Sequence, residues 1–302
     1  MTIKSLMHPK GLLISILMKC NRFFPDELYL KLLFRLKLGY RLNLKAPRTF
    51  NEKLQWLKLY AHKPEYTNMV DKVLAKEYVR PLIGEQYIVP SLGVWDTPEE
   101  IDFDALPNQF VLKTTDGGGS TGVVICTDKS KMEKEDIINR LHHALKQNIY
   151  GQLRERPYKN IKKRILAEKY LSDDSTSVKG DLNDYKFYCF NGKVTYCEVI
   201  TGRRTKKQID FFDLNWNHID FTFNEYDYAD ERPTKPECFD TMVEVADILC
   251  KDKPYSRIDL YVVGNKVYFG EITLFPASGF RGFHPEEWNV RLGDMITMPK
   301  QK

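Results

Sequence analysis

Two neighbouring segments near the C-terminus, residues 257–261 and 267–273, constrain the fold more than any other part of the chain. Both are rich in Val, Ile, Tyr and Phe, and the Gly264-Asn265 pair between them suits a two-residue hairpin turn. Side chains alternate between the two faces of a strand. The expected hairpin therefore places two sets of side chains on one face each: Arg257, Asp259 and Tyr261 on the first strand, and Phe269, Glu271 and Thr273 on the second.

Opposite charges meet if the two sets share one face of the hairpin. Asp259 and Glu271 would then stand beside Arg257 and the hydroxyl group of Thr273. Carboxylate oxygens on rigid strands suit Mg²⁺, which takes one or two carboxylates together with substrate phosphates. The alternative interpretation is a surface hairpin with a local Arg–Asp pair.

The composition is that of an ordinary soluble globular protein, with 42% hydrophobic and 29% charged residues. A length of 302 residues fits one large or two modest domains. The net charge of +5 is too small to require nucleic acid, and it suits an anionic small molecule or polymer. The six cysteines show no CxxC pattern, which argues against a zinc site or a disulfide framework and favours a reducing cytoplasm.

The N-terminus carries an apolar run at residues 12–18, preceded by Lys4 and Lys10. The run is too short to span a bilayer. Lys19 follows it where a signal-peptide cleavage site would require a small residue. We therefore expect an amphipathic or buried first helix, and a weak contact with the membrane surface stays open as an alternative.

Helical patterns dominate the first part of the chain. Leucines recur at helical spacing within residues 1–45, and Thr49 to Glu52 has the capping-box form that opens a helix. Further helices are expected over residues 70–79, 129–147 and 240–251, and residues 96–100 have the composition of a helix start.

Strand patterns begin near residue 87. Asn191-Gly192 joins two of them in the strongest hairpin pattern of the chain. The expected strands cover residues 88–95, 110–115, 123–126, 165–171, 184–190 and 193–199.

Two loops between these elements are suited to anions. The glycine-rich segment 116–122 can bring backbone N–H groups close to phosphate oxygens, although it is not a Walker A loop because no Gly-Lys-Ser/Thr follows. Residues 201–207 are strongly cationic through Arg203 and Arg204, and they would clamp an anionic substrate. The alternatives are a flexible surface turn for the first loop and a solvated loop for the second.

The order of these features resembles that of the ATP-grasp superfamily. Lys113 on a strand precedes the glycine-rich segment, a strand that ends in the run from Glu168 to Leu171 follows, and Lys186 lies on a later strand before the hairpin. The Arg-x-Asp and Glu-x-Thr pair of the hairpin, with Pro276 after it, is similar to that of carboxylate–amine ligases such as D-alanine–D-alanine ligase.

A finer resemblance is to the TupA-like ATP-grasp proteins of bacterial surface-polysaccharide gene clusters. It runs over nearly the full chain from about residue 45 onward, on motifs at residues 49–56, 71–72, 110–113, 191–193, 213–216 and 270–273. Two positions depart from the related patterns. Thr273 stands where the last metal ligand is normally Asn, and residues 116–120 read Asp-Gly-Gly-Gly-Ser where this branch often has His-Gly-Ser-Gly.

The resemblance implies an α+β fold of the ATP-grasp type in three parts. Residues 1–86 would form a mostly helical N-terminal region. Residues 87–170 would form an antiparallel-sheet lid with the glycine-rich flap, and residues 171–302 an antiparallel-sheet core with packed helices that binds metal and substrate.

The resemblance also implies ATP and Mg²⁺ as cofactors. Lys113 and Lys186 would bind the phosphates, and Arg257 with Lys186 would stabilise charge during the reaction. The metal would be held by Asp259, Glu271 and Thr273. The remaining nucleotide contacts would be a phosphate flap of Gly117, Gly118, Gly119 and Ser120, and an adenine hinge of Glu168, Lys169, Tyr170 and Leu171.

The reaction implied by the resemblance is phosphoryl transfer from ATP to a carboxylate, followed by attack of an amine to give an amide. The partners would be a small-molecule amine and a carboxylate-bearing sugar, such as a uronic acid of a polysaccharide precursor, and no nucleic acid. Arg203 and Arg204 would hold this substrate. Two alternatives stay open: a sugar-nucleotide glycosyltransferase that binds its metal through Asp102 and Asp104, and a non-catalytic ATP-binding protein.

Overall fold

The N-terminal part of the chain is helical in the computed structural model, which describes residues 9–117, 122–172, 182–202 and 205–300. Its helices are α2 (Pro9–Lys19), α3 (Asp26–Leu38), α4 (Phe50–Tyr60), α5 (Tyr66–Val70) and α6 (Lys72–Ile83). No helix within the described ranges is long and apolar enough to cross a membrane.

Side-chain caps fix where two of these helices begin. The predicted capping box opens α4, because Thr49 accepts a hydrogen bond from the Glu52 backbone and the Glu52 carboxylate accepts one from the Thr49 backbone. Asp71 accepts hydrogen bonds from the backbone of Val73 and Leu74. The helix expected over residues 70–79 therefore begins at Lys72, and it continues to Ile83.

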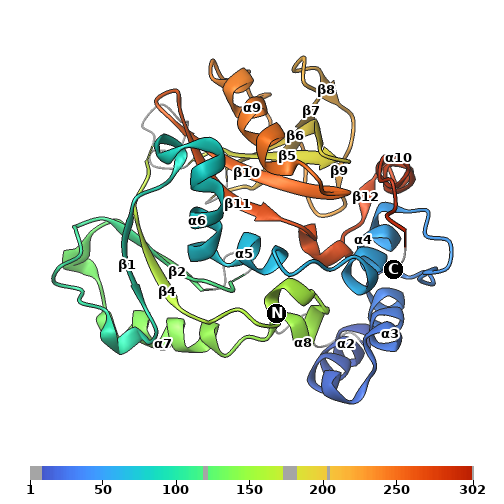
Figure 1. The fold of residues 1–302 in the computed structure, drawn as a ribbon, viewed down its shortest axis with the longest axis horizontal. Helices are drawn as coiled ribbons and strands as arrows, with labels where there is room; N and C mark the ends of the chain where they lie inside the picture. The colour runs from blue at the N-terminus through green and yellow to red at the C-terminus, as the bar shows by residue number, and fades with distance from the viewer. Residues whose placement is uncertain (1–8, 118–121, 173–181, 203–204, 301–302) are drawn as a thin grey trace.

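A four-stranded antiparallel sheet, here called the lid sheet, follows the helices (left in Figure 1). Its strands are β1 (Ser91–Trp95), β2 (Phe110–Thr114), β3 (Val123–Cys126) and β4 (Ile165–Lys169), in the order β1-β4-β2-β3. Helix α7 (Lys134–Leu145) packs against it, and α8 (Ile149–Leu153) leads back toward β4. Phe110, Leu141 and Ile165 belong to a hydrophobic core of the lid sheet that is separate from the other core of the molecule.

Two helix predictions in this part were wrong in extent. The helix expected from residue 129 begins at Lys134, because Asp128 accepts a hydrogen bond from the Ser130 backbone and shapes residues 129–131 into a separate 3-10 turn. The helix start expected at residues 96–100 gives only the 3-10 turn Pro98–Glu100.

A six-stranded antiparallel sheet, here called the main sheet, forms the C-terminal part. Its order is β11-β10-β5-β6-β7-β8. The strands are β5 (Asp184–Phe190), β6 (Lys193–Thr201), β7 (Gln208–Phe212), β8 (His218–Ile219), β10 (Tyr255–Val263) and β11 (Lys266–Thr273). Helix α9 (Phe239–Cys250) packs on one face, while β9 (Thr222–Phe223) pairs with β12 (Phe283–His284) and α10 (Trp288–Asp294) ends the fold.

The predicted hairpin is β10 and β11, and its register brings the expected polar residues together. Arg257 pairs with Thr273 and Asp259 pairs with Glu271. The pairing then shifts, so that Leu260 faces Phe269. The expectation that Phe269 shares the face of Glu271 was wrong, because the extra residue at position 270 forms a β-bulge and reverses the alternation.

The N-terminal helices and the main sheet share one large core. Leu33, Leu54 and Val79 from three different helices belong to the same buried cluster as Phe187 and Ile258 of the sheet. In Figure 1, α5 and α6 lie between the lid sheet and the main sheet. The three-part division at residues 86 and 170 stays a prediction.

Candidate active site

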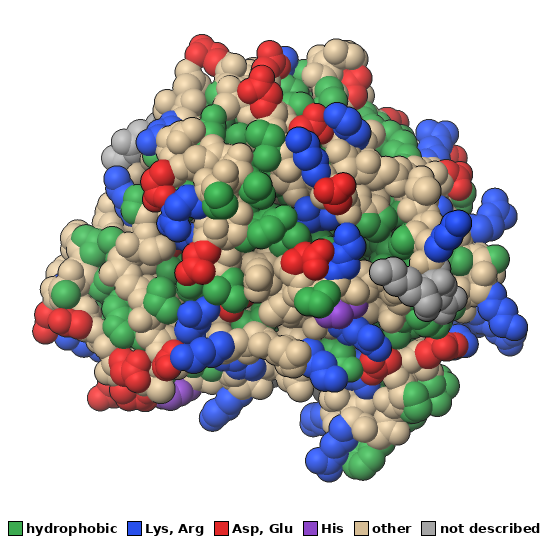
Figure 2. Space-filling model, in the orientation of Figure 1, with side chains coloured by type: hydrophobic (Ala, Val, Ile, Leu, Met, Phe, Trp, Pro, Cys, Tyr) green, Lys and Arg blue, Asp and Glu red, His purple; other side chains and the backbone are tan. Residues whose placement is uncertain are grey.

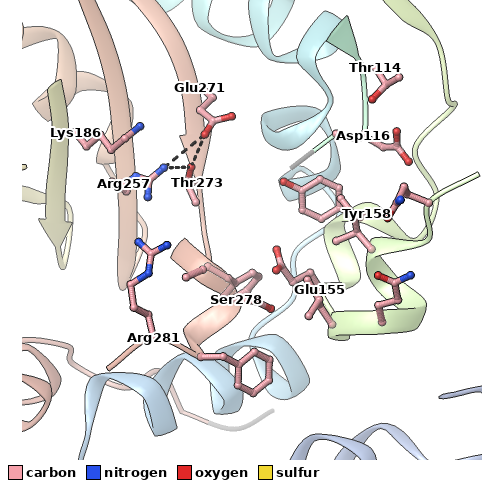
Figure 3. Close-up of a pocket in the computed structure, with 18 of the residues that line it drawn as sticks. Thr114, Asp116, Glu155, Tyr158, Lys186, Arg257, Glu271, Thr273, Ser278 and Arg281 are labelled. Atoms are coloured by element: carbon pink, nitrogen blue, oxygen red, sulfur yellow. Dashed lines mark hydrogen bonds and ion pairs between the residues drawn. The ribbon is translucent and has the colours of Figure 1, made fainter. Parts of the chain in front are cut away.

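A cavity of about 500 Å³ opens beside the polar face of the β10–β11 hairpin (Figure 3). Lys186, Arg257, Glu271 and Thr273 line it from the main sheet. The opposite wall is formed by residues around the lid sheet and α8, among them Thr114, Asp116, Gly117, Glu155 and Tyr158. The structure therefore brings the hairpin and the second strand lysine to one hollow.

Asp259 is the centre of a buried charge cluster on the main sheet. Arg257 donates to it twice, from Nε to Oδ1 at 2.7 Å and from Nη2 to Oδ2 at 2.7 Å. Lys186 also donates to Oδ2, and it lies 4.0 Å from the carboxylate of Asp184. Burial alone would raise the pKa of Asp259, but the charges of Arg257 and Lys186 outweigh it and hold that pKa below its usual value.

The cavity side of this cluster is more open. Arg257 Nη2 donates to Thr273 Oγ1 at 3.1 Å and lies 3.5 Å from Glu271 Oε1. Thr273 in turn donates to Glu271 Oε1 at 3.3 Å. These contacts are the dashed lines of Figure 3. The Glu271 side chain is 45% exposed, so its carboxylate is accessible from the cavity.

The donor set of the hairpin fits a hard cation of the Mg²⁺ type. Three donor groups use both oxygens of Asp259, but a carboxylate has about four lone-pair sites, and Glu271 keeps accessible oxygens. One or two carboxylates suffice for Mg²⁺ when substrate phosphates complete the shell. No group of three or more His, Cys, Asp or Glu side chains suited to a metal occurs in the part of the chain that the structure describes.

A second charge cluster lies on the lid sheet. Glu168 is buried between two lysines, with Lys76 Nζ and Lys113 Nζ each 2.5 Å from one of its oxygens. Burial opposes ionisation of Glu168, but the two lysines lower its pKa to about 2. Lys113, at 21% side-chain exposure, is the accessible member.

Lys72 lies between the two clusters. Its Nζ donates to the carbonyl of Gly117, which lines the cavity. Burial lowers the pKa of Lys72, and the charges of Glu271 and Lys113 both act on it. Lys72 and Lys76 were missed from the sequence as site residues. Their four-residue spacing on one face of α6 was the available signal.

The other predicted site residues fall in different places. Lys169, Tyr170 and Leu171 lie at and just after the end of β4, and Lys169 donates its backbone N–H to the carbonyl of Pro90. Gly118, Gly119, Ser120, Arg203 and Arg204 lie outside the described residues.

The aspartates proposed for a glycosyltransferase metal do not line the cavity. Asp102 accepts hydrogen bonds from the backbone of Asp104 and Ala105, as expected for a surface turn. Asp104 pairs with Lys134 at 3.0 Å.

Comparison with known proteins identifies the family. The model of the TupA-like ATPgrasp family matches residues 52–297. The chain belongs to the TupA-like ATP-grasp family. This membership confirms the predicted family and the predicted α+β ATP-grasp fold. No match was found among curated proteins.

Solved structures similar to this TupA-like protein are distant from it in sequence. D-alanine–D-alanine ligase from Bacillus anthracis has 18% identity and a TM-score of 0.43, over 82% of this chain and 69% of that one. The enzyme from Helicobacter pylori has 15% identity and a TM-score of 0.43, over 82% and 69%. The ATP-grasp ligase PsnB, complexed with minimal precursor, Mg and ADP, has 15% identity and a TM-score of 0.37, over 74% and 57%.

Proposed function

We propose that this protein is an ATP- and Mg²⁺-dependent carboxylate–amine ligase. The observation that carries the proposal is a pair of charge clusters, one with an excess of carboxylates and one with an excess of lysines, whose charges both act on Lys72. Around Asp259, two cations face three carboxylates, those of Asp184, Asp259 and Glu271. Around Glu168, the lysines 72, 76 and 113 exceed the single carboxylate. Such a site can accept both a cation and a polyphosphate.

The residues of the chain take complementary roles in the proposed reaction. We assign Lys113 and Lys186 to the phosphate oxygens as point charges, the backbone N–H groups of residues 117–120 to the phosphates as well, and residues 168–171 to the adenine. Asp259 and Glu271, with the hydroxyl of Thr273 beside them, would hold Mg²⁺. When bound, the metal neutralises charge on the phosphates.

Arg257 supplies electrostatic stabilisation. Its guanidinium group is buried and its position is fixed by Asp259, so it costs little reorganisation when charge develops nearby. Burial opposes its charge, but Asp259 raises the pKa of Arg257 well above its usual value. Arg257 therefore stays cationic throughout phosphoryl transfer to the substrate carboxylate.

The substrates we propose are an amine and a carboxylate-bearing sugar, such as a uronic acid of a capsular or cell-wall polysaccharide or its precursor. This part rests on the gene-cluster context of the TupA-like family and on the cationic segment with Arg203 and Arg204. The reaction forms an acyl phosphate from ATP and the carboxylate, and the amine then displaces phosphate to form an amide. We propose that it takes place in the cytoplasm, and the free state of all six cysteines supports this.

Calorimetry with a non-hydrolysable ATP analogue, with and without Mg²⁺, tests the nucleotide site. We expect Mg²⁺-dependent binding that Glu271→Gln weakens about tenfold or more. A second assay measures ADP release with a panel of uronic acids and amines. Binding that ignores both Mg²⁺ and the substitution would contradict the proposed metal site.

The exposed face of α2 and α3 suits a weak peripheral contact with an anionic membrane surface, which we also propose. It carries the exposed apolar residues Leu12, Leu13, Ile16, Leu28 and Leu32, and Phe23 is exposed in the 3-10 turn between the two helices. Basic residues accompany them, and in Figure 2 hydrophobic and basic side chains adjoin over these helices at the lower right. Co-sedimentation with anionic but not neutral vesicles, reduced by Leu13→Ser with Ile16→Ser, would support it, and equal behaviour with both vesicles would contradict it.

A further inference from the structure

The turn after β11 has an unusual backbone. Ala277, Ser278 and Gly279 have φ values of 46°, 55° and 65° in succession. Consecutive non-glycine residues in the left-handed region are uncommon, because the Cβ atom crowds the neighbouring carbonyl. Strain of this kind persists only where the surrounding structure imposes it, and it is concentrated at functional sites.

Two buried polar side chains of α4 impose this conformation. Gln55 Nε2 donates to the carbonyls of Ser278 and Gly279 at 3.0 and 3.1 Å. Lys58 Nζ donates to the carbonyl of Ser278 at 2.7 Å, to its Oγ at 2.6 Å and to the carbonyl of Leu153 at 3.0 Å. A buried lysine thus ties the strained turn to the end of α8, and Ser278 and Leu153 both line the cavity.

Glu155 lies on the cavity wall beside this turn, between Tyr158 and Ser278 in Figure 3. It is only 7% exposed. Lys58 donates its hydrogen bonds to other groups, and within the described residues Glu155 interacts with the Ser278 side chain but has no direct ion pair. Burial raises the pKa of Glu155, and the charge of Lys58 opposes this shift. A buried carboxylate that faces a cavity without an ion pair is stabilised by a ligand that brings a cation.

The wall across from Glu155 is basic. Figure 3 shows Arg281 on that side, with Ser278 between the two. Arg281 and Lys207 both line the cavity and lie over the ring of Tyr226, at 5.6 and 4.5 Å from its centroid. This end of the cavity therefore offers one carboxylate, with Arg281 and Lys207 on the facing wall and a third cation, Lys37, over the ring of Phe280.

We propose that this end of the cavity binds the amine substrate, that this substrate is an amino acid, and that Glu155 receives its ammonium group. The carboxylate of the amino acid lies toward Arg281 and Lys207. The proposal rests on the proposed ligase function and assigns the second substrate within it. The strained turn, held by Gln55 and Lys58, sets the floor on which the amino acid lies.

Glu155 then accepts a proton from the ammonium group and leaves a neutral amine. The nitrogen lone pair forms the C–N bond at the carbonyl carbon of the acyl phosphate, and the C–O bond to phosphate breaks. Phosphate leaves with that electron pair and takes up the second proton from nitrogen. The products are the amide, inorganic phosphate and a protonated Glu155, which returns its proton to solvent.

Saturation-transfer difference NMR with the twenty standard amino acids, with and without ADP and Mg²⁺, tests the proposal on the full chain. Calorimetry then gives the Kd of the amino acid with the strongest signal. We expect Glu155→Gln to raise this Kd at least tenfold and to leave the Kd of the ATP analogue unchanged. Either of two results would overturn the proposal: no amino acid binds to wild type, or the Kd is the same in Glu155→Gln.

Two further variants separate binding from folding. Glu52→Gln removes another buried carboxylate, on α4 and away from the cavity, and should keep the wild-type Kd for the amino acid. Glu155→Asp keeps the carboxylate and should recover part of the amino acid binding that Glu155→Gln loses, while thermal denaturation compares the stability of both variants with that of wild type. Recovered binding at equal thermal stability supports a contact with the ligand, whereas weak binding that only follows a loss of thermal stability shows a structural role and overturns the proposal.

Failure of the proposed ligase would look different from failure of this inference. It would appear as absent ADP release with every carboxylate, or as absent Mg²⁺-dependent binding of the ATP analogue. Amino acid binding that depends on Glu155 is measured without either reaction step.

Discussion

The two charge clusters are built on the same plan but placed in different surroundings. In each, one buried carboxylate holds two cations: Asp259 holds Lys186 and Arg257, and Glu168 holds Lys76 and Lys113. The first cluster belongs to the main sheet, whose core is shared with the N-terminal helices. The second lies on the lid sheet, which has a separate and smaller core.

The difference lies in what each cluster leaves available. The Asp259 cluster has further carboxylates at its edge. Glu271 is the exposed one, so this cluster can bind a cation. The Glu168 cluster has lysines at its edge instead. Lys113 is partly exposed and Lys72 lies close by, so this cluster can bind an anion. A buried counter-ion thus fixes the geometry in both cases, and the residue at the rim decides what binds.

Asp259→Asn should break the first cluster and give the largest effect. The substitution leaves Arg257 and Lys186 buried without the carboxylate that they share. Removal of one partner from a buried ion pair typically costs about 3–5 kcal/mol. Urea denaturation at neutral pH, followed by circular dichroism, measures the change. A loss below about 1 kcal/mol would show that water or a rearranged side chain replaces Asp259 without difficulty.

Glu168→Gln should break the second cluster with a smaller and pH-dependent effect. The folded-state pKa of Glu168 is about 2, below its ordinary value of 4.5. The stabilisation is therefore fully present above about pH 4.5 and is lost as the pH falls through about 2, and at about 1.4 kcal/mol per pKa unit it amounts to roughly 3 kcal/mol. Hydrogen exchange of β2 and β4 amides should show wild type protected more strongly than the variant at pH 6. A difference that does not shrink between pH 5 and 2 would contradict this origin.

Local sequence rules predicted those parts of the fold whose partners are close along the chain. The capping box at Thr49 and the hairpin that pairs Asp259 with Glu271 both depend on short-range geometry, and both are present. The family resemblance added the fold class. Phe269 was assigned to the wrong face because a bulge is not visible in a pattern of period two.

The floor of the cavity could not be predicted from spacing. Lys58 reaches the carbonyl of Leu153 across 95 positions and Ser278 across 220. A buried lysine on an apolar helix face reads in the sequence as a surface residue, since nothing local marks its partners. Glu155 likewise has no neighbouring motif, and only the folded chain places it beside Ser278 in one cavity.

Gly270→Ala should disturb the geometry of the Asp259 cluster without removing a charge. A Cβ atom at this bulge would lie 2.9 Å from the Asp259 carbonyl oxygen and 2.9 Å from the Tyr261 ring. Overpacking of this kind typically costs about 1–3 kcal/mol. We expect reduced stability in urea and weaker Mg²⁺-dependent nucleotide binding, because Glu271 is the next residue along the strand.

Gly264→Asn at the turn of the same hairpin is the matched control, since nothing lies within 4 Å of a Cβ there and Asn tolerates its positive φ. Equal losses in both variants would argue that the turn, not the bulge, sets the site.

Glu271→Gln should have the smallest effect on stability of the four substitutions, within about 0.5 kcal/mol of wild type. The side chain is 45% exposed, and Arg257 keeps both of its bonds to Asp259 when the charge is lost. The same substitution is the one expected to weaken Mg²⁺-dependent nucleotide binding about tenfold or more. A urea titration and a calorimetric titration of one protein sample measure the free energy of unfolding and the affinity for the nucleotide.

If exposed residues at the edge of the cluster decide binding and buried counter-ions decide stability, Glu271→Gln should lose nucleotide binding and keep its stability. A loss of stability comparable to that of Asp259→Asn would mean that Glu271 belongs to the buried framework, and the distinction between rim and framework would fail for the main sheet.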